Sequence, residues 1–369
     1  MQGTQSPPPS EDLKHLLALL SINGIGSATA SRLINTFGSA KSIFDLPANV
    51  LEKHRLKNST ISDIQNFCFS QIEPTLAWLE APDHHLITAE SPFYPTLLAQ
   101  IPNPPMALFA VGNIELLATP QIAVIGTRKP SASGMGMAHD FSQHLCEAGY
   151  TITSGLAVGV DGESHRAALK SGGNTIAVMG TGPDRIYPAH HRELAHQIAD
   201  KGLLLTERLP GTKFDTGAFP QRNRIIAGLS LGTLVVEAAK KSGTLITANL
   251  AADYGREVFA IPGSIHNPLS HGCHHLIKQG AKLVESCEDI LEDLPHFKLS
   301  AAPTIHKHDQ RPELSVEDHA FLNHVDFDIT SVDTIVARSQ LTVDAVTNKL
   351  LALELQGWIL NSAGGYIRQ

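Results

Sequence analysis

Short apolar runs alternate with amphipathic, helix-like segments between residues 121 and 285. The runs are rich in Val, Ile and Leu and apolar almost throughout, which is typical of parallel strands covered on both faces. Since helix-like segments separate them, the pattern predicts an α/β fold with a doubly wound parallel sheet of extended Rossmann-like type. The runs are QIAVIG (121–126), YTITSG (150–155), NTIAVMG (174–180), GLLLTE (202–207), GTLVVEA (232–238), REVFAIPG (256–263) and AKLVE (281–285).

The chain before this region has a different pattern. Residues 1–10 are expected to form a disordered tail, and residues 11–82 read as a small helical domain of SAM or helix-hairpin-helix type, with a Gly-Ile-Gly turn at Gly24–Gly26. Such a turn can offer backbone N–H groups to a DNA phosphate. With only Arg32 and Lys41 nearby, a tight turn between packed helices is the favoured interpretation.

Residues 84–118 are rich in proline and include SPFYPTLLAQIPNPPMALFAVGN. Proline and glycine clusters mark turns and loops, so we expect an ordered coil that lies along the next domain. That domain, which contains the alternating strands and helices, is predicted to span residues 84–296.

The C-terminal part reads as a linker, residues 297–312, and a small domain, residues 313–369. Three helix-like segments, SVEDHAFLNHV, TSVDTIVARS and TVDAVTNKLLALELQGW, precede a closing hairpin in ILNSAGGYIRQ. That order predicts a winged helix-turn-helix. The third segment, which would be the recognition helix, contains one basic residue, Lys349, and two acidic residues, Asp344 and Glu354. The whole domain has 3 basic and 8 acidic residues. DNA binding without phosphate-neutralising charge would be weak, so a protein-contact or structural role is favoured for this domain.

The net charge of −8 at first disfavours a nucleic-acid partner, but the charge is unevenly placed. Residues 121–296 carry 16 basic and 17 acidic residues. Nine of these basic residues follow the ends of the expected strands, and the carboxyl ends of parallel strands meet at one edge of the sheet. The nine are Arg128, Lys129, Arg185, Arg208, Lys213, Arg222, Arg224, Lys240 and Lys241. The sequence therefore predicts a basic rim on a domain that is nearly neutral.

The segment IAVIGTRKPSASGMGMA, residues 122–138, joins a strand, a Gly- and Ser-rich loop and a helix-like run. A strand that ends in such a loop before a helix is a common phosphate site. The absence of GxxxxGK[ST] and of a well-placed GxGxxG indicates neither an ATPase nor a standard dinucleotide binder. The candidate phosphate-binding residues at this edge are Gly126, Thr127, Arg128, Lys129, Ser131, Ser154, Gly155, Lys213, Phe219, Arg222, Asn223, Arg224, Lys240, Lys241, Ser242, Gly243 and Thr244.

Two catalytic motifs have simpler explanations. GLSLG, Gly228–Gly232, matches the nucleophile elbow of hydrolases, but here a helix-like run precedes the serine and a strand follows it, which is the wrong order. Asp161 and His165 are spaced to share one helix face, which would suit acid–base chemistry. The favoured interpretation is that Asp161 caps the helix and His165 packs beside it.

The four cysteines, Cys68, Cys146, Cys273 and Cys287, form no CxxC pair, so a reduced cytoplasmic setting is expected. The sequence offers no apolar run of the ~20 residues that cross a bilayer and no signal-peptide pattern at its start. The run SHGCHH places His271, His274 and His275 around Cys273. A second ligand cluster is lacking, so a native metal site is disfavoured.

Five motifs closely resemble the DNA-processing protein A family, also called DprA or Smf. They are GTRKPSASG, SGLAVGVDGESHRAAL, TIAVMGTGPDRIYP, FPQRNRIIAGLS and VVEAAKKSGTLITANLAADYGREVFAIPG, and FYPTLLAQIPNPPMALFAVGN extends the resemblance upstream. The resemblance implies a dimeric cytoplasmic protein, not an enzyme, that binds single-stranded DNA without a cofactor. It further implies that the protein protects DNA taken up in natural transformation and helps to load a RecA-type recombinase onto it.

The resemblance also assigns roles to residues. Gly126-Thr127-Arg128 occupies the Gly-Ser-Arg motif of the family and keeps its hydroxyl, whereas Ser133 stands where tyrosine is common. Arg128 and Lys129, with N–H groups of the loop and helix start, would hold DNA phosphates. Arg222-Asn223-Arg224 matches the Arg-Asn-Arg run of the family. Lys213, Arg222 and Arg224 would line the same groove, with Phe219 as a platform for base stacking.

Two alternative functions remain, one as an enzyme and one as a sequence-specific regulator. Lonely Guy-like nucleotide phosphoribohydrolases share this sheet type and have a PGGxGTxxE site. The comparable GLSLGTLVVEA lacks Pro-Gly-Gly and places Glu237 four residues after Thr233 instead of three, so Glu237 is expected to order a loop. A sequence-specific regulator acting through residues 313–369 is the other alternative. Leu276 and Ile277, near the end of the sheet, are candidate dimer contacts.

Overall fold

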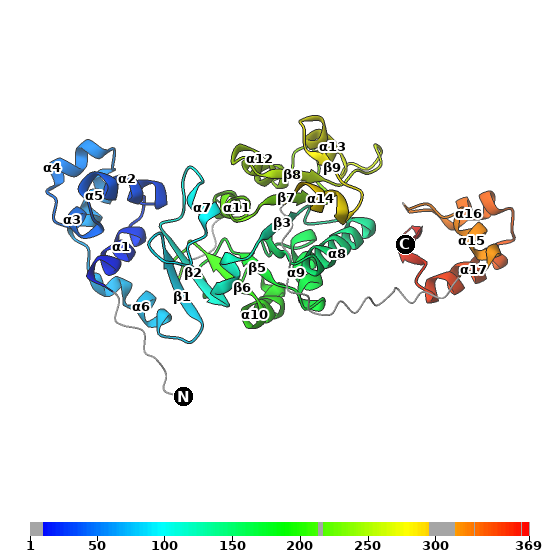
Figure 1. Cartoon of the computed structure of the whole chain (residues 1–369), viewed down its shortest axis with the longest axis horizontal. Coiled ribbons are helices and arrows are strands. Elements are labelled where there is room, and N and C mark those ends of the chain that lie inside the picture. Colours follow the sequence, from blue (N-terminus) through cyan, green and yellow to red (C-terminus); the bar gives the residue numbers. More distant parts are fainter. Residues whose placement is uncertain (1–9, 213–216, 295–313, 328, 363, 369) are drawn as a thin grey trace.

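The computed structural model describes residues 10–212, 217–294, 314–327, 329–362 and 364–368. The expected tail, the expected linker and Lys213 therefore lie outside the described residues, apart from Ser10. Figure 1 shows N-terminal helices in blue, a large sheet flanked by helices, and a small C-terminal unit in orange and red. Among the described residues, no helix combines the length and the apolar character that a membrane span requires.

A nine-stranded sheet forms the centre of the molecule, in the order β1-β2-β6-β5-β4-β3-β7-β8-β9. All seven expected strands are present, and they pair in parallel from β6 through to β9. The predicted doubly wound parallel sheet is therefore confirmed. The strands are β1 (His84–Thr88), β2 (Ala107–Gly112), β3 (Gln121–Ile125), β4 (Thr151–Ser154), β5 (Thr175–Val178), β6 (Leu203–Thr206), β7 (Gly232–Val235), β8 (Glu257–Ala260) and β9 (Lys282–Leu283).

The expectation of coil throughout residues 84–118 is wrong. The strands β1 and β2 form an antiparallel hairpin in this segment, with His84 opposite Val111, and β2 adds antiparallel to β6, with Phe109 opposite Thr206. The prolines that suggested coil lie in the connection between the two strands, where a missing N–H breaks no ladder hydrogen bond. The sheet is thus extended by two antiparallel strands at one edge.

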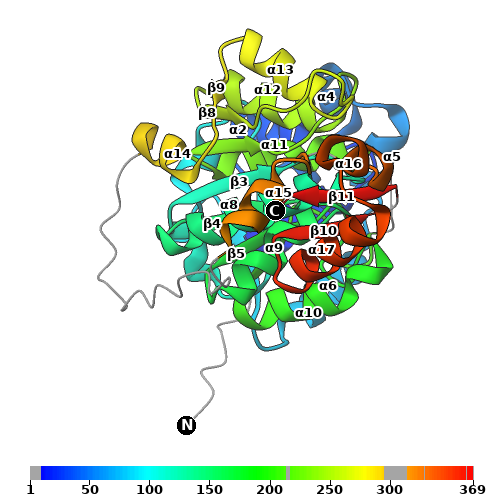
Figure 2. The ribbon, with the colours of Figure 1, turned by 90° about the vertical axis from the view of Figure 1, so that its right-hand side faces the viewer.

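Helices cover both faces of the sheet, which explains why its strands are apolar throughout. On β3, Ile122 and Val124 pack with α8 and α14, whereas Ala123 and Ile125 pack on the opposite face with α11, α12 and α13. Figure 2 shows these two helical layers on either side of the strands. The helices are α7 (Thr96–Ala99), η3 (Ile114–Ala118), α8 (Ala132–Glu147), α9 (Val160–Lys170), η4 (Ala189–His191), α10 (Arg192–Lys201), α11 (Ala218–Leu229), α12 (Thr244–Asp253), α13 (His271–Lys278) and α14 (Cys287–Asp293).

The N-terminal helices have their own core and also contact the sheet. Gly24, with a φ of 89°, makes the turn between α1 and α2, and Leu33 and Ile43 are among the buried core residues. Leu17 and Ile72 pack against Phe109 of β2. The elements are α1 (Glu11–Ser21), α2 (Ser27–Phe37), α3 (Ala40–Phe44), α4 (Ala48–Leu51), η1 (Glu52–His54), α5 (Asn58–Gln65), η2 (Phe69–Ile72) and α6 (Glu73–Leu79).

The C-terminal unit has the three helices and the hairpin that the sequence predicts for a winged helix. They are α15 (Val316–Leu322), α16 (Val332–Ser339), α17 (Val343–Leu355), β10 (Ile359–Ser362) and β11 (Gly365–Arg368). The hairpin is antiparallel, with Ile359 opposite Arg368. Phe321, Ile335 and Leu350 belong to its separate apolar core.

Candidate nucleic-acid interface

An open cleft of about 830 Å³ lies at the carboxyl end of β3, where the sequence analysis placed a phosphate site. The β3–α8 loop, the start of α9, the first turns of α11 and the start of α12 form its walls. Ten of the candidate residues line it: Gly126, Thr127, Arg128, Lys129, Phe219, Arg222, Asn223, Ser242, Gly243 and Thr244.

Arg128 and Phe219 face each other in this cleft. The guanidinium carbon of Arg128 lies 5.6 Å from the centroid of the Phe219 ring, within the range of a cation–π contact. Arg128 and Lys129 are exposed. Within the described residues, neither side chain has an acidic partner. Both positive charges are therefore available to an anionic ligand.

A second ring, Tyr187, stands beside Phe219. The two ring centroids are 5.7 Å apart and the planes are inclined by 52°. Tyr187 is 46% exposed, and Ile246 at the opposite wall is 44% exposed. The set of candidate residues included neither side chain, since Phe219 was the one aromatic residue chosen for base stacking. The position of Tyr187 in the loop after β5 was the available signal.

Glu237 holds the β3–α8 loop in place. Its Oε1 accepts a hydrogen bond from the Ser131 hydroxyl at 2.6 Å, and its Oε2 accepts one from the Ser131 N–H at 2.9 Å. The Thr127 N–H donates to the Glu237 carbonyl at 2.8 Å. Glu237 is 4% exposed, so it orders the loop, as expected, and its carboxylate is engaged by the protein. Ser131 acts in the same clamp and as the N-cap of α8.

Several loop amides are also engaged. The Lys129 N–H donates to the Thr127 hydroxyl at 3.2 Å, and Thr244 donates its hydroxyl to the Gly126 carbonyl at 2.9 Å. The Thr244 N–H donates to Ser242. These bonds fix the loop and the start of α12 against each other. Because these amides are already bonded, a phosphate would be bound mainly by the side-chain cations Arg128 and Lys129.

Arg222 is buried, contrary to the expectation that it lines the groove as a free phosphate ligand. It is 5% exposed, and its Nη1 donates to the Gly155 carbonyl at 2.6 Å and to the Val178 carbonyl. Burial lowers the pKa of the guanidinium to about 10. Arg222 therefore ties the ends of β4 and β5 together beneath the Phe219 ring, whose centroid is 6.0 Å from its guanidinium carbon.

Asp161 and His165 lie at the floor of this region but do not form an acid–base pair open to substrate. Gly159, not Asp161, is the N-cap of α9. Asp161 accepts from the Ala157 N–H at 3.3 Å, and burial raises the pKa of its carboxyl while Arg222 opposes that shift. His165 is fully buried, with Nδ1 2.7 Å from the Thr175 hydroxyl, which confirms that it packs within the fold.

The other candidates that the structure describes lie outside the cleft lining. Arg224 forms an ion pair with Glu207 and donates to the Asn103 carbonyl at 2.7 Å, so it is directed toward the connection between β1 and β2. Buried Ser154 donates its hydroxyl to the Val124 carbonyl at 2.6 Å. A Cβ at Gly155 would lie 2.3 Å from Nη1 of Arg222. Lys240 and Lys241 are exposed on the turn before α12.

The residues considered as dimer contacts or metal ligands are mostly buried in the fold or bonded to the backbone. Leu276 is 4% exposed and belongs to the core of the sheet, so it is wrong as a surface contact, whereas Ile277 is only partly buried. Cys273 is buried against β7. His271 and His274 bond to the carbonyls of residues 265 and 263. Across the described ranges, no three His, Cys, Asp or Glu side chains gather as a metal site would require.

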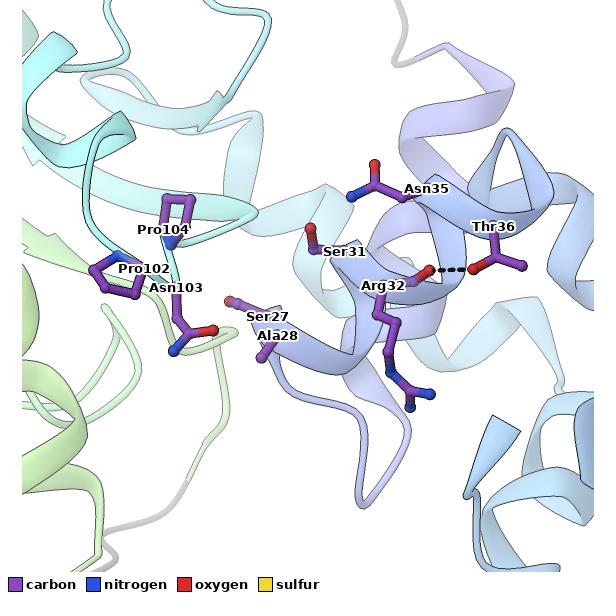
Figure 3. A pocket seen from close by; sticks show the side chains of 9 residues that line it. All are labelled: Ser27, Ala28, Ser31, Arg32, Asn35, Thr36, Pro102, Asn103 and Pro104. Carbon is purple, nitrogen blue, oxygen red and sulfur yellow. Dashed lines mark hydrogen bonds between the residues drawn. The ribbon is translucent and has the colours of Figure 1, made fainter. Parts of the chain in front are cut away.

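A separate cleft of about 360 Å³ lies between α2 and the loop of residues 102–104. Figure 3 shows Ser27 and Ser31 of α2 directed toward Asn103 and Pro104 across it. The only charged side chain in its lining, Arg32, donates to the His54 carbonyl at 2.9 Å. This cleft therefore offers little charge to a phosphate, in agreement with a packing role for the turn before α2.

Comparison with known proteins is consistent with this arrangement. The sequence model for "DNA recombination-mediator protein A" matches residues 85–295, and that for the "DprA winged helix domain" matches residues 306–365. Protein Smf of Escherichia coli strain K12 is 40% identical over 97% of this chain and 96% of its own length. DNA processing protein DprA of Bacillus subtilis strain 168 is 43% identical over 63% of this chain and 79% of its own.

Two solved structures have the same fold. DNA processing protein A from Streptococcus pneumoniae superposes with a TM-score of 0.66 and 36% identity, covering 76% of this chain and 98% of that one. DNA processing protein A from Helicobacter pylori, described for its single-stranded DNA binding mode, gives a TM-score of 0.52 and 30% identity over 56% of this chain and 94% of that one.

Proposed function

Since the chain belongs to the DNA recombination-mediator protein A family, we propose that it binds single-stranded DNA in the cleft at the end of β3. The observation that carries the proposal is the exposed Arg128 guanidinium held 5.6 Å from the Phe219 ring. A cation beside an aromatic ring suits a strand with a phosphate next to an unpaired base. Stacking accepts any base, so binding would be independent of sequence.

The groups left available in the cleft agree with this role. The charges of Arg128 and Lys129 are free of acidic partners within the described chain, while Arg222 and Glu237 are held by protein atoms. Phosphate attraction would thus come from the loop cations and base contact from Phe219. Binding and hand-over of DNA, with no bond chemistry and no cofactor, is the function that these groups favour over nucleotide hydrolysis.

We extend the proposal to the cellular role implied by the family. The protein would act in the cytoplasm as a homodimer, would protect single-stranded DNA that enters the cell in natural transformation, and would help to load a RecA-type recombinase onto it. Support comes from the family membership over nearly the whole chain. A recombinase-loading assay on protein-coated single strands tests this step separately from DNA binding.

The proposal predicts that Arg128→Ala weakens binding to single-stranded DNA. Affinity for an oligo-thymidylate and for a duplex of equal length is measured by fluorescence anisotropy over a range of salt concentrations. The wild-type protein should prefer the single strand, and its log K should fall with log salt by about 0.7 for each phosphate neutralised. Arg128→Ala should give a weaker and less salt-dependent affinity, because one phosphate contact is lost.

Lys170→Ala is the matched control, since Lys170 is an exposed cation at the other end of α9. It should behave like the wild type. Equal affinity for both DNA forms, or an Arg128→Ala affinity indistinguishable from wild type, would contradict the assignment. Release of free base from nucleoside monophosphates, abolished in Glu237→Gln, would instead support the phosphoribohydrolase alternative.

A further inference from the structure

A second cleft of about 620 Å³ adjoins the β3 cleft at Tyr187. Tyr187 is the one side chain that lines both. The second cleft is built by the loop after β5 and by the first turns of α10, and its charged lining consists of Arg185, Arg192, His196 and Asp184. The sequence analysis placed Arg185 on the basic rim but gave Arg192 and His196 no role.

Arg192 and His196 lie on one face of α10, and both line this cleft. They are one helical turn apart at the start of α10, and both are exposed. Within the described residues, neither side chain has a hydrogen bond or ion pair with another residue. An exposed arginine on a helix commonly pairs with a neighbouring carboxylate, and here the neighbouring Glu193 accepts a hydrogen bond from Gln197 instead.

Arg185 faces the same space with a weak internal partner. Its Nε lies 3.7 Å from Oδ2 of Asp184, and its side chain is 49% exposed. Asp184 in turn accepts the Gly211 N–H at Oδ1, at 2.8 Å. One carboxylate, already used to fix a loop, therefore stands against two arginines, and the cleft keeps a positive balance.

The two clefts share an aromatic boundary at Tyr187. Tyr187 is 46% exposed and its ring centroid is 5.7 Å from that of Phe219. A polymer with alternating phosphates and flat bases can pass over such a pair of rings and keep stacking contacts on the way. A small nucleotide bound at Arg128 would be too short to contact the cations beyond Tyr187.

We propose that the second cleft is a phosphate subsite for the same single strand, which runs from Arg128 across Phe219 and Tyr187 to Arg185 and Arg192. This rests on the proposed function of the β3 cleft and adds the path of the bound strand beyond that cleft. A strand that fills both clefts makes more phosphate contacts than one that fills the first alone. The subsite therefore contributes only when the strand is long enough to reach it.

The test compares Arg185→Ala/Arg192→Ala with wild type on oligo-thymidylates of about 4 to about 20 nucleotides. On the longest strands the double variant should bind about tenfold more weakly, and its log K–log salt slope should be shallower by about 1.4, for two phosphates lost. On the shortest strands that bind, the double variant should match wild type. Lys201→Ala, an exposed cation at the far end of α10, is the matched control.

Arg192→Lys should keep most of the long-strand affinity, because the subsite uses the charge; this variant also separates charge loss from a folding defect. Equal binding of wild type and double variant at every length would overturn the subsite and leave the β3 cleft as the whole site. A loss of affinity that is the same for short and long strands would also overturn it. If Arg128→Ala has no effect on any length, it is the proposed function that fails.

Discussion

Three arginines of the expected groove have three different environments. Arg128 is exposed and has no carboxylate partner among the described residues, Arg222 is buried and bonded to two carbonyls, and Arg224 is paired with Glu207. A buried guanidinium must have its donors satisfied by the protein, so Arg222 is a structural residue at the edge of a binding site. Residue type and position along the chain do not separate these roles, because burial of each side chain depends on how α11 docks on the sheet.

At the scale of a single residue, His165 predicts part of the pH dependence of stability. Burial lowers the pKa of its imidazole to about 3 in the folded chain, against about 6.5 in an unfolded chain. Between these values the unfolded state binds a proton that the folded state does not. The free energy of unfolding should therefore fall as pH drops below about 6.5, by at most about 1.4 kcal/mol per pH unit from this group.

His165→Gln keeps a hydrogen-bonding group near Thr175 and should remove that contribution. Urea unfolding at several pH values gives the slope for each protein. His266→Gln, which changes an exposed histidine, should leave the wild-type slope in place. A slope that His165→Gln leaves unchanged would show that this histidine is accessible to protons in the folded chain.

At the scale of elements, the strands were predictable and the additional hairpin was not. Seven apolar runs gave seven strands because parallel strands with helices on both faces are buried along their whole length. The strands β1 and β2 were missed because prolines in their connection dominated the composition of residues 84–118. The cleft was located by the rule that ligands meet the carboxyl ends of strands, whereas Tyr187 and Ile246 needed the docked loops to be recognised.

The β3–α8 loop should depend on its clamp to β7. Ser131→Ala and Glu237→Gln each disturb hydrogen bonds to a buried carboxylate, so each should lower the free energy of unfolding by about 1–3 kcal/mol. The double variant should lose less than the sum, because the second change has little left to break. Thermal or urea unfolding of the four proteins measures this, and single-strand affinity should fall in the same order as the loop loses its shape. Strict additivity would show that the two residues act independently.

At the scale of the whole molecule, we propose that residues 11–82, 84–296 and 313–369 are separate domains. In the part of the chain that the structure describes, the apolar core of the C-terminal unit is formed by residues of that unit alone, whereas the N-terminal helices share a small core with β2. Exposed apolar side chains are frequent in the C-terminal unit, where Val343 and Leu355 of α17 are 58% and 81% exposed. This surface fits a protein contact better than a phosphate backbone.

Removal of residues 313–369 should therefore leave single-strand affinity within about twofold of wild type at physiological salt. The deleted unit has 3 basic and 8 acidic residues and does not line the β3 cleft, so little attraction is lost. Anisotropy with an oligo-thymidylate measures the affinity, and a melting curve shows that the sheet domain stays folded. Loss of most DNA binding would assign it to the winged helix.

The ion pair of Arg224 and Glu207 has a mechanical consequence. Glu207 directly follows β6, and it pairs with Arg224 of α11, which also donates to the Asn103 carbonyl. Ser27 at the start of α2 donates to Glu207 at 3.4 Å. The Glu207 carboxylate thus links the start of α2, the end of β6 and α11. Within the described residues, the N-terminal helices contribute nothing to the lining of the β3 cleft. A displacement of α2 would nevertheless be transmitted through Glu207 and Arg224 to α11, the helix that carries Phe219.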